Sequence, residues 1–499
     1  MRIPLVRHTV HLVNISVPFR SGIEDMTLPP SGILYVGGYL KIRGYDVVIH
    51  HIRATEIDDC ISVILADDSL LFVGFSLMTG IQVTYSARMS SLLKARNGNI
   101  VVVWGGIHPS LMPKECLDFG FVDYVVIGEG EITVAELSDF LAQESDRPAE
   151  MIRGLSFIRN NRWILTQDRP FENNLDNFRQ DWKLVDPSKY VRSIGEERTS
   201  CYISSRGCPH DCGFCYNKKF NLRKWRCHSV AFTVDELGKI NSQTGINSVI
   251  FDDDNFFTDR KRGLEILRRL KSQGIICKWI NLRVDYISED FLKELVGLGV
   301  ESIFMGWESG NRNTLQKISK GFSPELILEK TRILSRFREL TVDASAIVGF
   351  PWETEEDIRE TQQLMLEMFR INPFRMHFTI GLYIPFPGSP ILEEAFQRGF
   401  RFPQDPEGWS KFDILFGAME LPWMTRERVR LISLIDKYSK LLLVSRKSTP
   451  LMKFLQYAIA LAAYGRLRAG VFGFPFEVWL TDLYQMRQLK RNHSLAKRG

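Results

Sequence analysis

The chain has 499 residues, of which 44% are hydrophobic and 25% charged, with a formal net charge of +5. This length exceeds what one core ordinarily supports, so we expect a globular protein of two or three domains. Eight cysteines are too few for a disulfide scaffold, and the small charge argues against a dedicated nucleic-acid binder. The N-terminal residues contain no signal peptide, so we expect a reducing, cytoplasmic compartment.

The first 145 residues alternate between predicted helices and strands. The segment PPSGILYVGGYLKIRGYDVVIHH predicts a helix that stops at Gly44 and a strand that follows it. Further strands are predicted in LLFVGFSLMTG, IVVVWGGIHPSLMP and FVDYVVIGEGE, and helices follow the first and the last of these. This alternation is typical of a doubly wound, Rossmann-like α/β domain.

Glycine-rich turns stand where these predicted strands end. Glycine allows a ligand to approach the backbone closely, so the turns indicate a ligand site. None of them spells G-x-G-x-x-G after the first strand, so the usual nicotinamide fingerprint is lacking.

The stretch SSRGCPHDCGFCYNKKF places Cys208, Cys212 and Cys215 within eight positions. A disulfide would use two of them and leave the third. A structural zinc site normally takes four ligands, for which Cys227 or His228 would have to be recruited. Three thiolates on a tight loop can instead hold three irons of a [4Fe–4S] cluster and leave the fourth iron open. The spacing favours the open cluster, with zinc as the alternative.

Residues 245 to 400 alternate between strands and helices, which predicts a parallel sheet covered by helices with sites at the carboxyl ends of the strands. Polar residues and turn formers fall at these ends: Asp252, Asp253, Asp254, Arg283, Glu308, Ser309, Glu353, Pro387 and Gly388. Capping of the following helix is the alternative for any single acid. Repetition of the pattern over five strands favours a ligand site.

C-x3-C-x2-C with an aromatic residue, Phe214, before the last cysteine resembles the signature of the radical SAM superfamily. The resemblance implies a central partial (β/α)6 TIM-type barrel and a [4Fe–4S] cluster whose open iron binds S-adenosyl-L-methionine (SAM). Reductive cleavage of SAM then gives a 5′-deoxyadenosyl radical that abstracts hydrogen from the substrate. An electron donor such as flavodoxin or ferredoxin is implied as a partner.

The same resemblance implies which side chains contact SAM. The second barrel strand usually ends in Gly-Gly-Glu, and the Asp-Asp-Asp found here resembles a variant of cobalamin-dependent members. The SAM contacts implied by position are Phe214, Asp252, Asp253, Asp254, Arg283, Glu308, Ser309 and Gly349.

GFSLMTG, WGGIHPS and VVIGEGE together resemble the cobalamin-binding domain that precedes the core in one subfamily, similar to anaerobic magnesium-protoporphyrin cyclases and P-methylases. The resemblance covers about residues 10 to 400. Implied cobalamin contacts are Ser76, Thr79, Gly105, Gly106, His108, Gly128 and Glu129. Asp-x-His-x-x-Gly, whose histidine ligates cobalt in many relatives, is missing. We therefore expect base-off cobalamin with its nucleotide tail in the domain, and no histidine is assigned as the cobalt ligand. For His108, which follows the Gly105–Gly106 turn, a structural role is expected and a place near the cobalamin is the alternative.

The C-terminal hundred residues are predicted to be helical. Their apolar run FLQYAIALAAYGRLRAGVFGFPFEVWL is interrupted by Arg466 and Arg468 and broken by Pro475, so it predicts no transmembrane span. A pair of core helices is one interpretation. An interfacial patch in peripheral contact with a membrane, or a lid for an apolar substrate, is the alternative, and the basic end KRNHSLAKRG would help the former.

The predicted α/β organisation has a cobalamin-binding domain (1–145), a linker with a short hairpin (146–195), a radical SAM core (196–403) and a C-terminal helical domain (404–499). The resemblance implies methyl transfer to an unactivated carbon of a small, possibly apolar substrate, with no nucleic acid as partner. Oxidative cyclisation or another rearrangement is the alternative chemistry. A non-catalytic iron–sulfur or zinc sensor that binds a nucleotide is the alternative from another class, against which the ordered polar strand ends argue.

Overall fold

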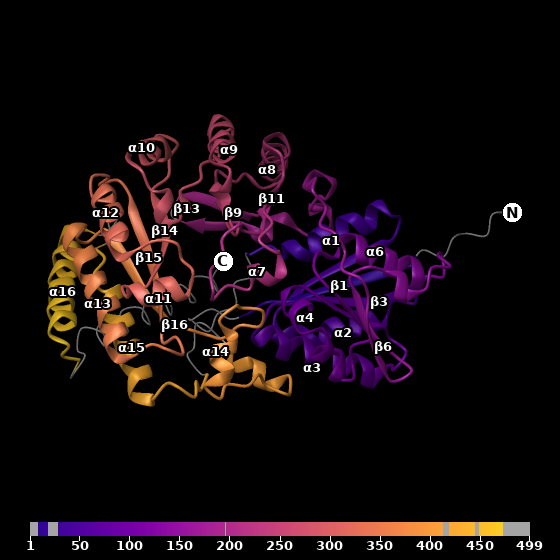
Figure 1. Cartoon of the computed structure of the whole chain (residues 1–499). Helices are drawn as coiled ribbons and strands as arrows, with labels where there is room; N and C mark the ends of the chain where they lie inside the picture. Colours follow the sequence, from indigo (N-terminus) through magenta and orange to yellow (C-terminus); the bar gives the residue numbers. More distant parts are fainter. Residues whose placement is uncertain (1–7, 18–27, 195, 413–418, 445–448, 473–499) are drawn as a thin grey trace. The chain divides into compact units, whose positions relative to one another are not determined.

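The computed structural model describes five stretches of the chain: residues 8–17, 28–194, 196–412, 419–444 and 449–472. The chain divides into two compact units: Met1–Cys277 with Ile384–Glu420, and Lys278–Tyr383 with Leu421–Gly499. The first unit contains the N-terminal sheet and the cysteine loop, and the second contains four further parallel strands (Figure 1).

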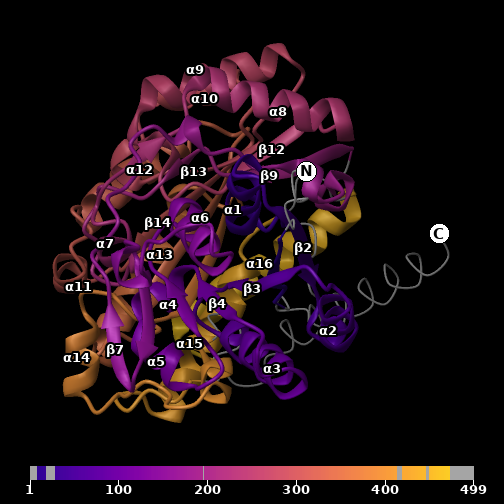
Figure 2. The ribbon, with the colours of Figure 1, turned by 90° about the vertical axis from the view of Figure 1, so that its right-hand side faces the viewer.

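A seven-stranded sheet in the order β2-β1-β3-β4-β5-β6-β7 dominates the first unit. Strands β2, β3, β4 and β7 of this sheet are labelled in Figure 2. Its strands are β1 Thr9–Ile15, β2 Asp46–Ile52, β3 Leu70–Ser76, β4 Val102–Gly105, β5 Tyr124–Val126, β6 Leu155–Arg159 and β7 Arg162–Leu165. The first five strands are parallel. The chain winds from β1 to β2 and then crosses to β3, so the order reverses between β1 and β3. Ligands of doubly wound sheets bind at the carboxyl ends of strands at such a switch point.

Six helices accompany this sheet: α1 Ser31–Ile42, α2 Ile57–Leu65, α3 Ile81–Arg96, α4 Ile107–Leu111, α5 Pro113–Asp118 and α6 Gly130–Leu141. Helices α1 and α6 pack together on one face, and α2 and α3 pack together on the other (Figure 1). The predicted doubly wound pattern is thereby confirmed, and Gly44 takes a positive φ of 96° just beyond α1, as a helix stop requires. Strand β1, which the sequence analysis did not predict, is almost fully buried because strands flank it on both sides.

The hairpin expected between residues 146 and 195 is formed by β6 and β7. Its two-residue turn is Asn160–Asn161, and both residues have positive φ, as the tight hairpin turns require. Strand β6 pairs antiparallel with β5, and Leu155 and Phe157 are buried in the core of the sheet. The sheet therefore continues through the segment expected to be a linker.

The rest of the first unit surrounds the cysteine loop. A three-stranded sheet has the order β12-β9-β8, and a short antiparallel pair, β10 with β11, lies beside the loop. The strands are β8 Arg192–Ile194, β9 Glu197–Tyr202, β10 Ser205–Arg206, β11 Arg226–Cys227 and β12 Ser248–Phe251. The helices are α7 Asn217–Phe220, α8 Val230–Thr244, α9 Arg260–Ser272 and α14 Leu392–Gln397. Strands β9 and β12 are parallel.

The second unit contains a parallel sheet in the order β13-β14-β15-β16. Its strands are β13 Trp279–Asn281, β14 Ser302–Glu308, β15 Thr341–Val348 and β16 Met376–Leu382. Its helices are α10 Glu289–Gly297, α11 Arg312–Lys317, α12 Pro324–Leu334, α13 Glu355–Ile371, α15 Arg426–Lys440 and α16 Pro450–Ala469. The predicted alternation is present throughout, and Ser288, Asn311, Ser323 and Thr354 cap the helices that follow them.

Within the described part of the chain, no helix is both long enough and apolar enough to cross a membrane. Helix α16 ends before Gly470, whose φ is 65°. Pro475 and the basic end of the chain lie outside the described residues.

A buried carboxylate closes the turn that follows β15. Glu353 Oε2 accepts hydrogen bonds from the backbone N–H groups of Gly349 and Phe350, at 2.6 and 3.1 Å, and Oε1 accepts one from the Thr314 hydroxyl at 3.1 Å. Burial outweighs these bonds and raises the pKa of Glu353 to about 7. Glu353 is therefore a structural acid of the turn.

This raised pKa predicts a pH dependence of stability. The folded form of Glu353 binds its proton more tightly than the unfolded form, so its contribution is complete below the unfolded pKa and is lost as pH rises to about 7. The loss amounts to about 3 kcal/mol. Glu353→Gln can still accept both backbone bonds, and we expect it to flatten the fall in Tm between pH 5 and pH 8. An unchanged slope in the variant would show that this carboxyl does not titrate as stated.

Candidate functional site

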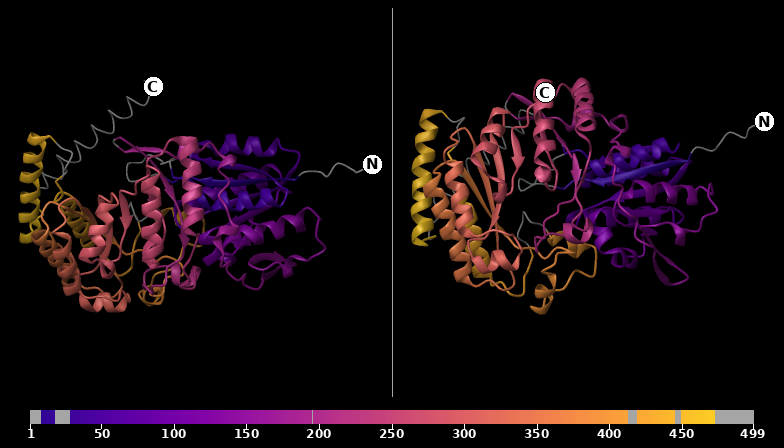
Figure 3. Two further views of the ribbon diagram at one scale, coloured as in Figure 1. Left: turned by 90° about the horizontal axis from the view of Figure 1, so that it is seen from above. Right: turned by 45° about the horizontal axis from the view of Figure 1, so that its top comes forward.

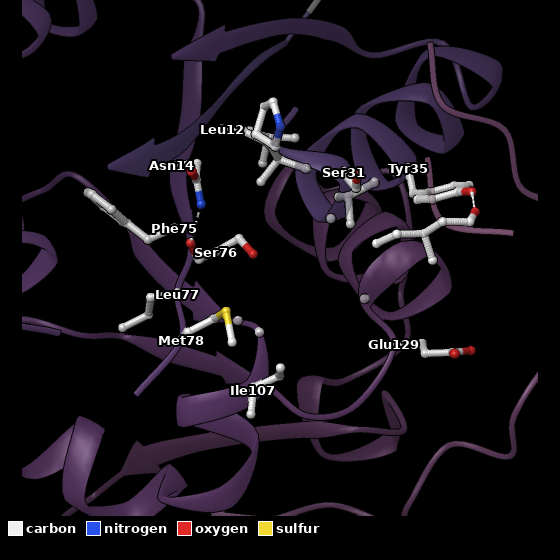
Figure 4. Close-up of a pocket in the computed structure, with 18 of the residues that line it drawn as sticks. Leu12, Asn14, Ser31, Tyr35, Phe75, Ser76, Leu77, Met78, Ile107 and Glu129 are labelled. Atoms are coloured by element: carbon white, nitrogen blue, oxygen red, sulfur yellow. Dashed lines mark hydrogen bonds between the residues drawn. The ribbon is translucent and has the colours of Figure 1, made fainter. Parts of the chain in front are cut away.

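A cavity of about 690 Å³ opens in the first unit at the carboxyl ends of β1, β3, β4 and β5 (Figure 4). It lies at the switch point of the sheet, and its size suits a small-molecule or cofactor site. Asn14 Nδ2 donates to the Ser76 carbonyl at 3.0 Å and so joins β1 to β3 beside the cavity. Most of the lining side chains are apolar, among them Phe75, Leu77 and Ile107.

Five of the seven predicted cobalamin contacts line this cavity: Ser76, Gly105, Gly106, Gly128 and Glu129. Thr79 and His108 are not among its lining residues. His108 is fully buried, its Nδ1 lies 3.1 Å from the Thr79 hydroxyl, and its ring packs edge-on against Trp409 with centroids 4.5 Å apart. Burial lowers the pKa of His108 to about 3, so the ring is neutral. This surrounding fits the structural role predicted for His108.

The two glycines at the end of β4, Gly105 and Gly106, differ in the room that they leave for a side chain. Gly106 has a φ of 97°, and a Cβ atom there would lie 2.7 Å from the Leu77 carbonyl oxygen and 2.9 Å from its nitrogen. The protein's own backbone therefore requires glycine at position 106. A Cβ atom on Gly105 would meet nothing closer than the Val126 side chain at 3.6 Å. Both positions line the cavity, and of the two, 105 is therefore the one that leaves ordinary room for a Cβ atom.

The opposite part of the cavity is built by the segments around the cysteine loop. Its lining there comprises Cys201, Tyr202, Ile203, Ser205, Arg206, Tyr216, Phe220, Asn221, Asp252 and Asp254. The glycine turns of the N-terminal sheet and the acidic turn after β12 therefore border the same space.

The three cysteines lie on the loop between β10 and α7. The Asn217 N–H donates to Cys215 Sγ at 3.5 Å, and Asn255 Nδ2 donates to Cys208 Sγ at 3.8 Å. Burial raises the pKa of the Cys215 thiol to about 12 and raises that of Cys208 as well. Partly buried thiols of this kind become thiolates when a metal centre binds them. The donor set and its N–H···S bonds fit an iron–sulfur cluster.

The fourth ligand that the zinc alternative requires is not brought together with the three cysteines among the described residues. Both ring nitrogens of His228 lie within hydrogen-bond distance of other side chains, Asp176 at 3.2 Å and Tyr35 at 3.0 Å. Cys227 lies in β11, paired with Ser205 of β10. Over the described ranges, no three histidine, cysteine or acidic side chains are grouped to hold a metal ion. A cubane places its thiolates on separate irons, so it does not require them to converge on one ion.

The three acids after β12 differ in their roles. Asp253 is buried and accepts hydrogen bonds from the Ser204 N–H at 2.7 Å, from the Ser204 hydroxyl at 2.8 Å and from the Ser205 hydroxyl. Asp254 Oδ2 accepts from the Gly207 N–H at 2.9 Å. Asp252 is exposed toward the cavity.

Capping of the next helix does not explain these acids. Helix α9 is capped by Asp259, whose side chain accepts from the Arg262 N–H at 3.0 Å. Asp253 and Asp254 instead hold the residues that lead into the cysteine loop, which is a third role that the sequence analysis did not consider.

Ion pairs with little solvent exposure join β10 and β11, the strands that flank the cysteine loop, to the beginning of α6. Arg206 Nη2 lies 2.7 Å from Glu131 Oε1, and Arg226 binds both carboxylate oxygens of Glu129 at 2.8 Å. Arg206 also stacks over the Tyr35 ring, 4.5 Å from its centroid. Sequence reasoning missed these pairs because their members are 75 and 97 residues apart.

The remaining predicted SAM contacts belong to the second unit, except Phe214, which precedes Cys215 and does not line the cavity. Glu308 ends β14 with a φ of 64°, and its Oε1 lies 2.7 Å from Lys320 Nζ, both side chains being 8% exposed. Arg283 donates to the Lys320 carbonyl at 3.1 Å. Strained backbone at a buried charged residue is typical of a functional site.

Ser309 comes directly after β14, and Gly349 comes directly after β15. Ser309 is buried with its hydroxyl 3.1 Å from that of Thr361, and Gly349 begins the turn closed by Glu353. Lys320 was not predicted, and no motif around it distinguishes it from a surface lysine.

Comparison with known proteins identifies the class to which this geometry belongs. The profile of the B12 binding domain matches residues 25–138, and that of the radical SAM superfamily matches residues 202–365. The chain thus belongs to the proteins in which a B12-binding domain is followed by a radical SAM domain, and its cofactors are cobalamin, SAM and a [4Fe–4S] cluster. The predicted family and cofactors are confirmed.

Individual relatives extend over most of the chain. An uncharacterized methyltransferase of Pyrococcus horikoshii is 29% identical over 83% of this chain and 88% of its own length. An anaerobic magnesium-protoporphyrin IX monomethyl ester cyclase of Synechocystis is 27% identical over 83% of this chain and 82% of its own.

The fold of this chain is similar to that of a solved structure. The radical SAM methyltransferase TsrM of Kitasatospora setae, with cobalamin and a [4Fe–4S] cluster bound, superposes with a TM-score of 0.62 over 92% of this chain and 89% of its own. At 17% identity this likeness concerns the fold alone. It confirms the predicted succession of a Rossmann-like domain, a partial barrel and C-terminal helices.

The acidic turn yields a paired prediction. Asp253→Ala removes the acceptor of three hydrogen bonds from Ser204 and Ser205, so we expect the free energy of unfolding to fall by about 3 kcal/mol. Asp252→Ala, one residue away and exposed, should leave Tm near its original value but weaken SAM binding by about tenfold or more, as loss of a charge-assisted bond does. Melting curves and SAM titration of the reconstituted protein measure both quantities. Equal loss of Tm in the two variants would remove Asp252 from the site.

The glycine turn yields a second pair. Gly105→Leu adds a bulky side chain at a lining position where the Cβ atom has room, so we expect it to weaken cobalamin binding by about tenfold or more. Gly98→Leu is the matched control, since Gly98 is exposed, away from the cavity, and its Cβ would meet only the Lys94 carbonyl at 3.9 Å. Titration with hydroxocobalamin compares them. Undiminished binding by Gly105→Leu would contradict this placement of the cofactor.

Proposed function

We propose that this cobalamin-dependent radical SAM enzyme transfers a methyl group to an unactivated carbon of a small, largely apolar substrate. One observation carries the proposal. A single cavity is bordered on one side by the glycine turns of the B12-binding domain and on the other by the acidic turn beside the cysteine loop. A methyl carrier and a radical source can act on one substrate only if they open into a common space.

The cysteine loop is proposed to hold the cluster through Cys208, Cys212 and Cys215. When bound, the cluster supplies the electron that cleaves SAM, and cobalamin carries the methyl group. The chain's own contribution is to shield the thiols partly from solvent and to supply N–H donors from Asn217 and Asn255 that favour the thiolate form. An electron donor such as flavodoxin or ferredoxin, in a reducing cytoplasm, is proposed to reduce the cluster.

The side chains around the acidic turn are proposed to orient SAM. Asp252 presents a carboxylate suited to an ammonium group. For Arg283 and Glu308, which belong to the second unit, contacts with a carboxylate and with a ribose hydroxyl are proposed, and Lys320 holds the Glu308 side chain in place through a bond of 2.7 Å. Ser309 and Gly349 are proposed to contact the ribose and adenine, and Phe214 to shield the cluster.

The glycine turns are proposed to accept cobalamin in the cavity. Ser76, Gly105, Gly128 and Glu129 would contact it, without a histidine on cobalt, since His108 packs on Trp409 and does not line the cavity. The apolar lining, with Phe75, Leu77 and Ile107, would exclude water from a reactive radical and favours an apolar substrate.

The relatives support methyl transfer without excluding its alternative. The Pyrococcus protein is named as a methyltransferase, whereas the Synechocystis protein is named as a cyclase. Oxidative cyclisation is therefore the second candidate for this chain.

Product stoichiometry distinguishes the two reactions. Methyl transfer consumes one SAM for the methyl group and one for the radical, so S-adenosylhomocysteine and 5′-deoxyadenosine should form in equal amounts. We expect this ratio when the reduced enzyme is incubated with an extract of cells that lack the gene, together with a labelled methyl group in one product. Formation of 5′-deoxyadenosine without S-adenosylhomocysteine would favour cyclisation.

A further inference from the structure

An apolar stripe is exposed along α16 in the second unit. The helix packs against α13 and α15, and its opposite side is uncovered by other described residues (Figure 3). The stripe follows helical spacing: Leu451, Phe454, Leu455, Ala458, Leu461 and Ala462. Leu451 and Phe454 are 78% and 74% exposed. A continuous exposed apolar face of this kind marks an interaction surface.

A basic pocket borders the stripe. It measures about 570 Å³, and its cationic lining residues are Arg338, Arg375 and Lys453, with no acidic side chain among the described residues that line it. Lys453 and Tyr457 belong to α16 itself and are one turn apart, so the pocket and the stripe share an edge. Helix α16 contains no acid, and its only charged side chains are Lys453, Arg466 and Arg468.

This combination has the chemistry of an interfacial helix. Such helices bury an apolar face at the boundary of headgroups and acyl chains and hold Lys and Arg at the level of lipid phosphates. A second copy of the chain fits this face less well, because a twofold-symmetric contact would bring the cationic pockets of both copies close together.

We propose that the α16 surface, meaning the stripe together with the basic pocket, docks on an anionic phospholipid membrane. The stripe contacts the acyl region, and Arg338, Arg375 and Lys453 receive a lipid phosphate. All residues of the α16 surface belong to the second unit, and docking on a membrane does not depend on the reaction proposed for the cavity.

Sedimentation with lipid vesicles tests the proposal on the full chain. We expect the protein to sediment with vesicles of phosphatidylcholine mixed with phosphatidylglycerol, but not with phosphatidylcholine alone. Phe454→Glu should abolish binding. Arg338→Gln and Lys453→Gln should each weaken it by roughly fivefold, since each removes one basic side chain near the charged surface.

Ile42→Glu is the matched control, because Ile42 is 73% exposed on α1 of the first unit and should bind vesicles normally. Failure of the unmodified chain to bind anionic vesicles would overturn the proposal. An equal loss of vesicle binding in Ile42→Glu and Phe454→Glu would overturn it as well. A dimer in analytical ultracentrifugation that Phe454→Glu dissociates, without vesicle binding, would assign the face to a second copy instead.

Discussion

The buried carboxylate of Asp253 is the constraint on which the cysteine loop depends. Burial raises the pKa of Asp253 to about 6, against the effect of the bonds from Ser204 and Ser205, so ionisation at neutral pH relies on those donors. Arg262 donates to the Ser204 carbonyl at 2.8 Å from the other side. The entry to the loop is thereby fixed before any cluster binds, which lowers the entropic cost of assembling three thiolates on it.

From this loop the charge network continues into the B12-binding domain. Arg206, two residues before Cys208, forms an ion pair with Glu131, and Arg226 forms one with Glu129. Buried pairs of this kind add little net stability but are costly to break singly, so they specify one arrangement of the groups that they join. The same turn lines the cavity through Glu129 and Gly128, so the network links the cysteine loop to the predicted cobalamin site within one unit.

Local patterns explain what could be predicted from the sequence. The cysteine spacing, the strand–helix alternation and the glycine turns are all contained in short windows, and the corresponding elements lie where they were expected. Strand β1 was missed, and the hairpin of residues 155–165 was expected to lie in a linker although it extends the sheet. Side-chain partners across long separations, such as Arg206 with Glu131 and Lys320 with Glu308, leave no local pattern.

Two residues show why a motif alone could not assign a role. The positive φ of Gly106 and the nearby Leu77 backbone require glycine whatever the ligand. Asp253 lies in the acidic motif after β12, but its carboxylate accepts hydrogen bonds from Ser204 and Ser205. Its neighbour Asp252 is exposed to the cavity. The spacing of such residues is visible in the sequence, but the direction of each side chain depends on the tertiary fold.

Cys208, Cys212 and Cys215 are proposed to hold, without a further cysteine, a cluster that SAM can reach. Electron paramagnetic resonance of the chemically reduced protein, with and without SAM, shows whether they do. The unmodified chain and Cys227→Ala should both show a reduced [4Fe–4S] signal that changes on addition of SAM, and Cys208→Ala should show none. Loss of the signal in Cys227→Ala as complete as in Cys208→Ala, or a signal indifferent to SAM in the unmodified chain, would contradict the account.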